Sequence, residues 1–194
     1  MGRKLEFEPG DAVEKAMLVF WRKGYERTSV GDLEDETGVG RKSLYRAFRD
    51  KEDLFLAALA NYRRFMADEN LAPLKAPGAD AETIRALLDK LASLGGTPDG
   101  AMGCLICNTA IELGRDLPEA SRHVDGYFEQ IKSAMAHALH GAVAKGQLRL
   151  SDDEIVQEAN FLFGVVQSLC VLGRAGAPPD TMRDVVASAM RRLD

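Results

Sequence analysis

Hydrophobic residues recur at spacings of three and four along almost the whole chain of 194 residues. This spacing is typical of amphipathic helices, whereas alternating runs of β-branched residues between turn dipeptides, which would indicate strands, are nearly absent. The pattern therefore predicts an all-α protein.

The N-terminal part of the pattern predicts three helices. The first begins near Pro9 and ends at Gly24, because proline is favoured in a first helical turn and glycine just beyond the last. Its apolar face consists of Ala12, Ala16, Val19 and Phe20. Two short helices follow within residues 29–47, separated by the turn Gly38-Val39-Gly40, and this is the spacing of a helix-turn-helix.

A long helix is expected next, from the capping residue Asp50 to about Asn70. The segment APLKAPGADAE, with two prolines and a glycine, then predicts a linker. We expect two domains, a helix-turn-helix domain over residues 1–50 and a larger helical domain over 51–194. The helices expected after the linker cover residues 81–94, 101–113, 118–145, 151–173 (with a capping box at Ser151) and the C-terminal stretch TMRDVVASAMRRLD.

Charge is distributed unevenly along the chain. The formal net charge is -5, which argues against indiscriminate binding to nucleic acid. Between Arg41 and Lys51, however, five cations face one anion, Asp50, so that this stretch carries +4. The local field is therefore opposite in sign to that of the whole chain.

The second short helix presents a basic outer face made of Arg41, Lys42, Ser43, Tyr45 and Arg46. Arginine and lysine can pair with guanine edges in a major groove, and serine and tyrosine can donate to phosphates. An isolated cluster of charges is more often a solvated face. The helix-turn-helix spacing favours DNA binding here.

The segment GYERTSVGDLEDETGVGRKSLYRAFRDKEDLF resembles the DNA-binding domain of the TetR/AcrR family of bacterial transcription regulators. The resemblance covers roughly residues 10–55 and rests on the Gly-Tyr, Thr-Ser-Val, Gly-Val and Ser-Leu-Tyr motifs in their order and spacing. It implies an N-terminal three-helix DNA-binding head, a helical ligand-binding body, and a homodimer built by the last two long helices.

Motif positions carry the family's DNA contacts onto this chain. They imply that Thr28, followed by Ser29, caps the first motif helix near a phosphate, that Tyr45 touches the DNA backbone, and that Lys51 meets a phosphate. The residues implied to face the groove are Arg41, Lys42, Ser43 and Arg46. Two departures stand out: Thr37 replaces the usual alanine, and Gly40 replaces the usual serine or threonine cap, a change that costs only a few tenths of a kcal/mol.

The segment MGCLICNTAIELG, from Met102 to Gly114, resembles the NemR-like subgroup, in which a cysteine at a similar position responds to electrophiles. Cys104 matches that position, and Cys107 lies one helical turn later. Three interpretations stay open: both thiols belong to the core, Cys104 is a partly exposed redox or electrophile sensor near a helix start, or the pair binds zinc. Zinc is disfavoured because no second Cys-x-x-Cys completes four ligands.

The helix expected over 152–173 is apolar on two sides, which predicts two partners, its own body and a second protomer. One stripe comprises Ile155, Ala159, Leu162, Val166 and Leu169, and the other Phe161, Val165, Ser168 and Leu172. A charge at Val166 or Leu169 is therefore expected to give monomers or misfolding.

Several function classes are disfavoured by what the sequence lacks. No phosphate-binding glycine loop, HExxH or nucleophile elbow is found, so neither an enzyme, a cofactor nor a metal site is expected. Three cysteines, a polar N-terminus and the lack of a long apolar run indicate a cytoplasmic protein without a membrane partner.

The sequence therefore predicts a ligand-responsive transcriptional regulator. We expect a repressor that binds a palindromic operator in double-stranded DNA as a homodimer and is released by a small-molecule or electrophile effector. The alternative is a helical small-molecule-binding or redox-sensing protein that does not bind DNA.

Overall fold

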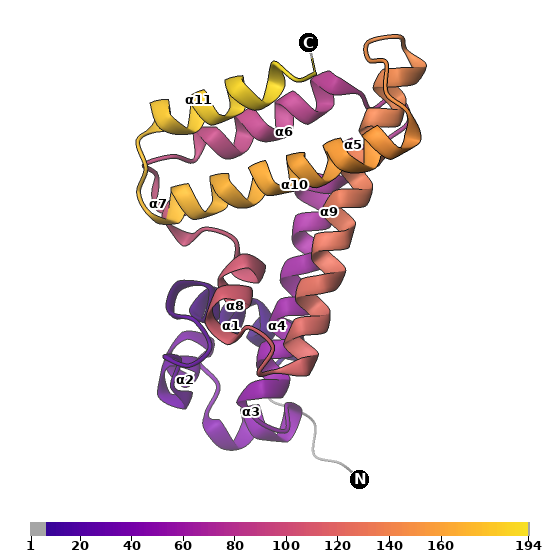
Figure 1. Cartoon of the computed structure of the whole chain (residues 1–194). Helices are drawn as coiled ribbons and strands as arrows, with labels where there is room; N and C mark the ends of the chain where they lie inside the picture. The colour runs from indigo at the N-terminus through magenta and orange to yellow at the C-terminus, as the bar shows by residue number, and fades with distance from the viewer. Residues whose placement is uncertain (1–6, 194) are drawn as a thin grey trace. The chain divides into compact units, whose positions relative to one another are not determined.

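A computed structural model describes residues 7–193. Within that range the chain forms helices and no strand, which confirms the predicted all-α class (Figure 1). The elements are α1 Pro9–Lys23, α2 Val30–Thr37, α3 Arg41–Ala47, α4 Lys51–Met66, the π-helix η1 Ala67–Leu71, α5 Ala72–Lys75, α6 Ala81–Ser93, α7 Pro98–Met102, α8 Leu105–Leu113, α9 Pro118–Ala144, α10 Asp152–Arg174 and α11 Pro179–Met190.

The chain divides into two compact units that do not follow its order. Among the described residues, the first unit contains 7–65 together with Leu105–Val124, and the second contains Met66–Cys104 together with 125–193. Helix α8 and the start of α9 therefore pack with the N-terminal helices, although they come from the second half of the sequence. The division at residue 50 stays a prediction.

In the first unit, α1 packs its apolar face against α4. The predicted face of α1 is buried, and the helix ends at Gly24 as expected. Aromatic rings complete the contact: Phe20 meets Phe55 at 4.9 Å between ring centroids, and Trp21 meets Tyr62 at the same separation. These two edge-on pairs join the C-terminal end of α1 to α4.

Helix α4 begins where the sequence predicts and continues into a less regular segment. The Asp50 carboxylate accepts a hydrogen bond from the backbone N–H of Asp53 at 2.8 Å, which confirms the cap. After Met66 the chain forms the π-helix η1 and then α5. The first four residues of the predicted linker are therefore helical.

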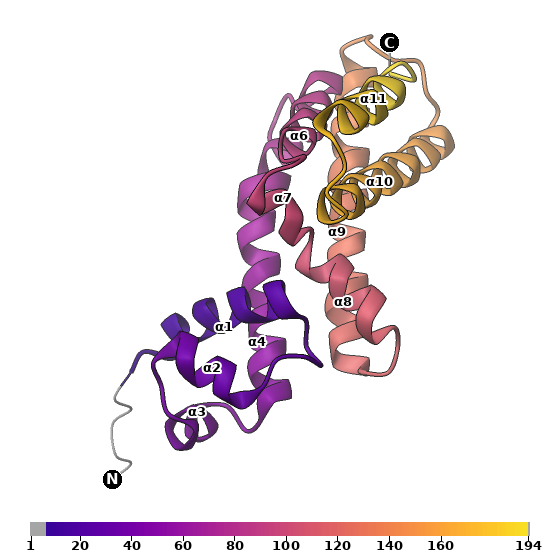
Figure 2. The same cartoon turned by 90° about the vertical axis from the view of Figure 1, so that its left-hand side faces the viewer.

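The second unit contains α6, α10 and α11 side by side, as both views show (Figures 1 and 2). Their buried faces include Ile84, Leu162 and Val186, which are almost fully shielded from solvent. The segment before α6 lies directly on α9, where an added Cβ at Gly141 would be 1.9 Å from the carbonyl oxygen of Ala79. Only glycine at that position permits this close approach.

The helix predicted over residues 101–113 is two helices, so that prediction was wrong. Helix α7 ends at Met102 and α8 begins at Leu105, because Gly103 has a φ of +63°, which is incompatible with a continuous helix. Arg174 secures the break by donating a hydrogen bond from its Nη1 to the carbonyl oxygen of Met102 at 2.9 Å.

By length and composition alone, α10 could cross a membrane. A core helix of a soluble protein passes the same test. Helix α10 buries Leu162 and Leu169 within its own unit and begins with a capping box between Ser151 and Glu154, as predicted. The apolar character of its inner side therefore follows from packing in the core.

Candidate DNA-binding site

The turn between α2 and α3 is stabilised in part by Thr37, which replaces the alanine that is usual in the family. Gly38 takes the left-handed conformation that ends α2, with a φ of +71°. Thr37 donates its hydroxyl to the carbonyl oxygen of Leu33 at 2.6 Å and accepts the N–H of Val39 at 3.2 Å. The hydroxyl that replaces the usual alanine thus joins the end of α2 to the turn.

Helix α3 is capped by a residue that the sequence analysis missed. Its N-cap, Gly40, has no side chain to offer, but the Glu34 carboxylate accepts the N–H of Arg41 at 2.5 Å. A carboxylate is favourable at this position because the first N–H groups of a helix are unpaired and carry partial positive charge. Glu34 therefore takes the place of the missing hydroxyl cap.

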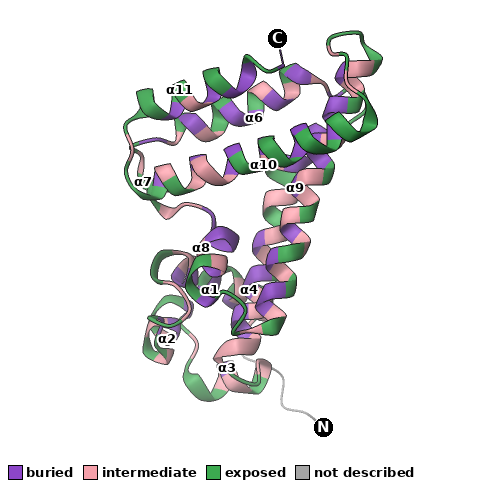
Figure 3. Ribbon diagram, viewed as in Figure 1, coloured by how far each residue is buried: buried purple, intermediate pink, exposed green. Residues whose placement is uncertain are grey.

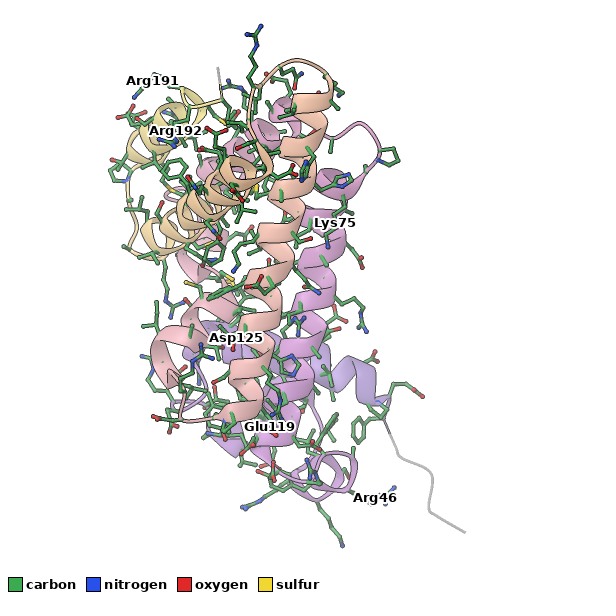
Figure 4. All side chains as sticks on the ribbon, turned by 45° about the vertical axis from the view of Figure 1, so that its right-hand side comes forward. Arg46, Lys75, Glu119, Asp125, Arg191 and Arg192 are labelled. Atoms are coloured by element: carbon green, nitrogen blue, oxygen red, sulfur yellow. The ribbon has the colours of Figure 1, made fainter. Side chains whose placement is uncertain are left out.

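The predicted outer face of α3 is on the surface. Leu44 is buried on the inner side, whereas Arg41, Lys42 and Arg46 are exposed. Ser43 and Tyr45 are half-buried, so that α3 carries almost only intermediate and exposed positions (Figure 3). The side chain of Arg46 projects away from the ribbon (Figure 4).

Two of these side chains contact each other. The Arg41 guanidinium lies over the Tyr45 ring at 5.6 Å from its centroid, one helical turn away. A cation above an aromatic face is attracted to it, and the contact limits the rotamers that the arginine samples. Arg41 is thus partly oriented before any partner binds.

The start of α2 differs from the prediction for Thr28. Ser29 is the N-cap: its hydroxyl accepts the N–H of Asp32 at 3.1 Å, and Asp32 accepts the N–H of Ser29 at 2.9 Å. Thr28 is 1% exposed and donates its hydroxyl to the carbonyl oxygen of Gly24 at 2.6 Å. The capping role implied for Thr28 was wrong, because its hydroxyl is used in the turn and the helix begins one residue later.

Asp32, in the first turn of α2, is kept ionised by its hydrogen-bond donors. Its Oδ1 accepts a hydrogen bond from Lys23 at 2.6 Å, and this bond, with those from Ser29, lowers the pKa of Asp32 to about 2. The capping box therefore persists throughout the physiological pH range.

Lys51 has a structural role in addition to the one implied for it. Its ammonium donates to the carbonyl oxygens of Tyr25 and Thr28 at 2.9 and 3.0 Å, and it lies 4.3 Å from the centroid of the Tyr25 ring. Burial, followed by the nearby carboxylates of Glu52 and Glu26, raises the pKa of Tyr25. Lys51 thus ties α4 to the turn before α2, and its phosphate contact stays a prediction.

The thiols do not have the exposure that a surface sensor requires. Cys104 and Cys107 are 7% and 8% exposed, which agrees with the interpretation that both belong to the core and contradicts the partial exposure that the sensor interpretation requires. Gly103 lies so close to the last turn of α10 that an added Cβ would be 3.3 Å from the carbonyl oxygen of Cys170, and this packing buries its neighbour. Burial first, then electrostatic interaction with Cys104 and Cys170, raises the pKa of Tyr127.

No group of three or more histidine, cysteine or acidic side chains suited to a metal ion occurs within residues 7–193. Cys104 belongs to the second compact unit and Cys107 to the first, so the two thiols are divided between separate cores.

The two apolar stripes of α10 have different surroundings. The stripe with Val166 and Leu169 is buried within its own unit, so charges there are expected to disturb the core. Of the second stripe, Phe161 is 40% exposed, Ser168 and Leu172 are half-buried, and Val165 is buried, so the stripe is only partly on the surface. Two residues outside the stripe, Val156 and Val171, are 58% and 47% exposed. We call Val156, Phe161, Gly164 and Val171 the exposed α10 face; no atom lies within 4 Å of a Cβ built on Gly164.

Arg192 contacts α10 through an ion pair with Glu158 and through the ring of Phe161. The buried Glu158 accepts hydrogen bonds from Nε and Nη2 of Arg192 at 3.0 and 2.9 Å. The same guanidinium lies 4.6 Å from the centroid of the Phe161 ring. Phe161 is therefore held in place at the surface.

Comparison with known proteins matches both the N-terminal and the C-terminal part of the chain to family models. Residues 12–58 match the family described as bacterial regulatory proteins, tetR family, and residues 81–189 match the tetracyclin repressor-like C-terminal domain. The uncharacterized HTH-type transcriptional regulator YezE of Bacillus subtilis (strain 168) is 33% identical over 194 residues, which is the full length of both chains. The HTH-type transcriptional repressor ComR of Escherichia coli (strain K12) is 28% identical and covers 98% of this chain and 90% of its own.

Solved structures agree with this assignment. A cysteine mutant of the TetR family regulator CifR, complexed with a 26-base-pair operator, is 27% identical and aligns over 98% of each chain with a TM-score of 0.84. The reduced form of E. coli NemR shares the fold, with a TM-score of 0.82 at 16% identity over 93% of this chain and 94% of its own. The chain thus belongs to the TetR family of bacterial transcriptional regulators, which are DNA-binding proteins and not enzymes.

Proposed function

We propose that this chain is a cytoplasmic repressor that binds a near-palindromic operator as a homodimer and leaves it when an effector binds. The observation that carries the proposal is the exposed face of α3, with Arg41, Lys42 and Arg46 on the surface of a helix-turn-helix. The relative ComR is named as a repressor, and the neighbour CifR is complexed with operator DNA.

The chemistry of α3 suits a major groove. Arg41, Lys42 and Arg46 offer donors to guanine O6 and N7, and Ser43 and Tyr45 offer hydroxyls to phosphate oxygens. Ser29 and the first N–H groups of α2 suit a second phosphate, because a helix N-terminus favours an anion. Base reading thus belongs to α3, and positioning on the DNA backbone to the start of α2.

A dimer would place two copies of α3 in successive major grooves. This requires the two helices to be about 34–36 Å apart, one turn of DNA. An effector releases the operator only if it binds more tightly to a conformation in which that spacing no longer fits. Release is therefore a shift between two states of the dimer.

The exposed α10 face is the surface that we assign to the dimer contact. It carries three exposed apolar side chains around Gly164, and it lies opposite the side that α10 buries in its own unit. In a two-fold dimer the same surface contributes from both protomers, and glycine permits two helices to approach closely. Arg192, which follows the end of α11, contacts this face at Phe161.

Release by an oxidant or electrophile is the second form of the proposal. Cys104 remains the candidate for this response. It lies near Tyr127, as does Cys170, and Cys170 is half-buried and therefore more accessible to a reagent than Cys104. A reagent reaches Cys104 only after local opening, since reactivity requires an accessible thiolate.

Salt-dependent binding to duplex DNA tests the central proposal. The purified chain should bind a duplex selected from a random library more tightly than unselected duplex, with an affinity that falls as salt rises. Arg46→Ala should weaken binding to the selected duplex by about 1–3 kcal/mol and relax its specificity. The matched control is Arg149→Ala, an exposed arginine of the second unit. Equal loss on both duplexes would contradict base reading by Arg46, and no binding to any duplex would favour the helical sensor that does not bind DNA.

A further inference from the structure

Glu112, near the end of α8, holds the backbone of the turn that follows α1. Its Oε2 accepts the N–H of Tyr25 at 3.0 Å, and its Oε1 accepts the N–H of Glu26 at 2.9 Å. These partners lie more than 80 residues away in the sequence and within the same compact unit. One carboxylate therefore binds two consecutive backbone amides of the DNA-binding head.

The turn is shaped to receive this carboxylate. Gly24 has a φ of +84°, which side chains rarely permit, and an added Cβ would lie 2.6–2.9 Å from the carboxyl atoms of Glu112. Glycine is thus required here for both conformation and space. In Figure 2 the turn after α1 extends toward α8.

The same turn is held from its other side by Lys51. We call residues 24–28 the α1–α2 turn. Its carbonyl oxygens at Tyr25 and Thr28 accept from the Lys51 ammonium, while its N–H groups donate to Glu112. The turn leads directly into Ser29, the cap of α2. A cation from α4 and an anion from α8 therefore set together where α2 begins.

We propose that Glu112 is a positioning residue for DNA binding, which fixes the α1–α2 turn, and with it the start of α2, relative to α8. The proposal rests on the proposed function. Helix α8 lies within the region that matches the C-terminal domain of the family, yet it packs on the head. A displacement of α8 changes the position of the turn through these two hydrogen bonds.

The sign of the effect separates positioning from simple electrostatics. Glu112→Gln removes a negative charge from the DNA-binding unit, and charge alone would tighten binding to the DNA polyanion. Positioning requires the opposite, because the amide keeps only one acceptor oxygen and the second N–H loses its partner. We expect operator affinity to fall about tenfold, the equivalent of one charge-assisted hydrogen bond.

The experiment uses the full-length protein and a duplex selected by the wild type from a random library. Glu112→Gln and Glu112→Asp should both bind it more weakly, since aspartate keeps the charge but is one methylene too short to reach both amides. Glu119→Gln, which makes the same change of charge at an exposed pair with Arg122 in the same unit, should bind no more weakly than wild type. The salt slope should stay unchanged in all three variants, because no phosphate contact is removed.

Amide hydrogen exchange supplies a readout that does not depend on DNA. The N–H groups of Tyr25 and Glu26 should exchange faster in Glu112→Gln, while the urea midpoint stays close to that of Glu119→Gln. A folded Glu112→Gln that binds the selected duplex as tightly as wild type, or more tightly, overturns the proposal. So does a loss of affinity matched by an equal loss of folded protein. If the wild type binds no duplex, both the proposed function and the positioning role of Glu112 are wrong. If the wild type binds the selected duplex and Glu112→Gln binds it equally well, only the positioning role is wrong.

Discussion

The carboxylate of Glu34 should be worth more to the stability of α3 than its surface position suggests. Helix α3 has seven residues, too few to form a stable helix without tertiary support, and its N-cap is a glycine. The hydrogen bond from the N–H of Arg41 to Glu34 is the side-chain cap that this helix has. Glu34→Ala therefore removes the acceptor from the first turn.

The magnitude follows from known capping energies. Loss of a side-chain cap costs roughly 0.5–2 kcal/mol, and we expect about 1–1.5 kcal/mol here because the acceptor is charged. With a urea dependence of about 2 kcal/mol per M, the midpoint should fall by about 0.5–0.8 M at fixed protein concentration. DNA affinity should fall as well, since α3 carries the groove-facing side chains.

A second substitution provides the control. Gly40 has extended backbone angles, and an added Cβ would meet only the Glu34 Oε1 within 4 Å, at 3.9 Å, so serine fits there without strain. Gly40→Ser supplies the hydroxyl cap that the family pattern usually has. Because a glycine cap costs only a few tenths of a kcal/mol relative to serine, the substitution should raise the urea midpoint of Glu34→Ala by about 0.1–0.2 M. If the double variant unfolds at the same urea concentration as Glu34→Ala alone, the capping role assigned to Glu34 is wrong.

Three further predictions concern pH, assembly and the thiols. Hydrogen bonds from Lys23 and Ser29 lower the pKa of Asp32 from 3.8 to about 2, so the contribution of this carboxylate to stability is present above about pH 5 and is lost as the pH falls toward 2. The difference in urea midpoint between wild type and Asp32→Asn should therefore shrink over that range. A difference that stays constant with pH would contradict this reasoning. Phe161→Glu, on the exposed α10 face, should give folded monomers by sedimentation, and a dimer of unchanged stability would exclude this face. A thiol reagent should label Cys170 before Cys104, and peroxide should weaken operator binding in wild type but not in Cys104→Ser; identical responses would leave Cys104 as core.

The sequence alone determined the features that depend on near neighbours in the chain. The spacing of apolar residues predicted the helices, and Gly24, Asp50 and Ser151 marked helix ends that the structure confirms. Helix periods and caps are local, because each involves residues within about four positions of one another. The helix-turn-helix spacing and the basic face of α3 could be predicted for the same reason.

Only the tertiary structure decided which side chains these helices bury, which they expose, and which distant residues they contact. The periodicity of α10 indicated two apolar sides but could not show that the stripe with Leu169 faces its own core and Phe161 faces outward. The burial of Cys104 depends on the last turn of α10, and the contact of Glu112 with the α1–α2 turn joins segments far apart in the chain. Such contacts form only when whole helices pack against one another. The residues next to a side chain in the sequence therefore do not specify its partner in a distant segment.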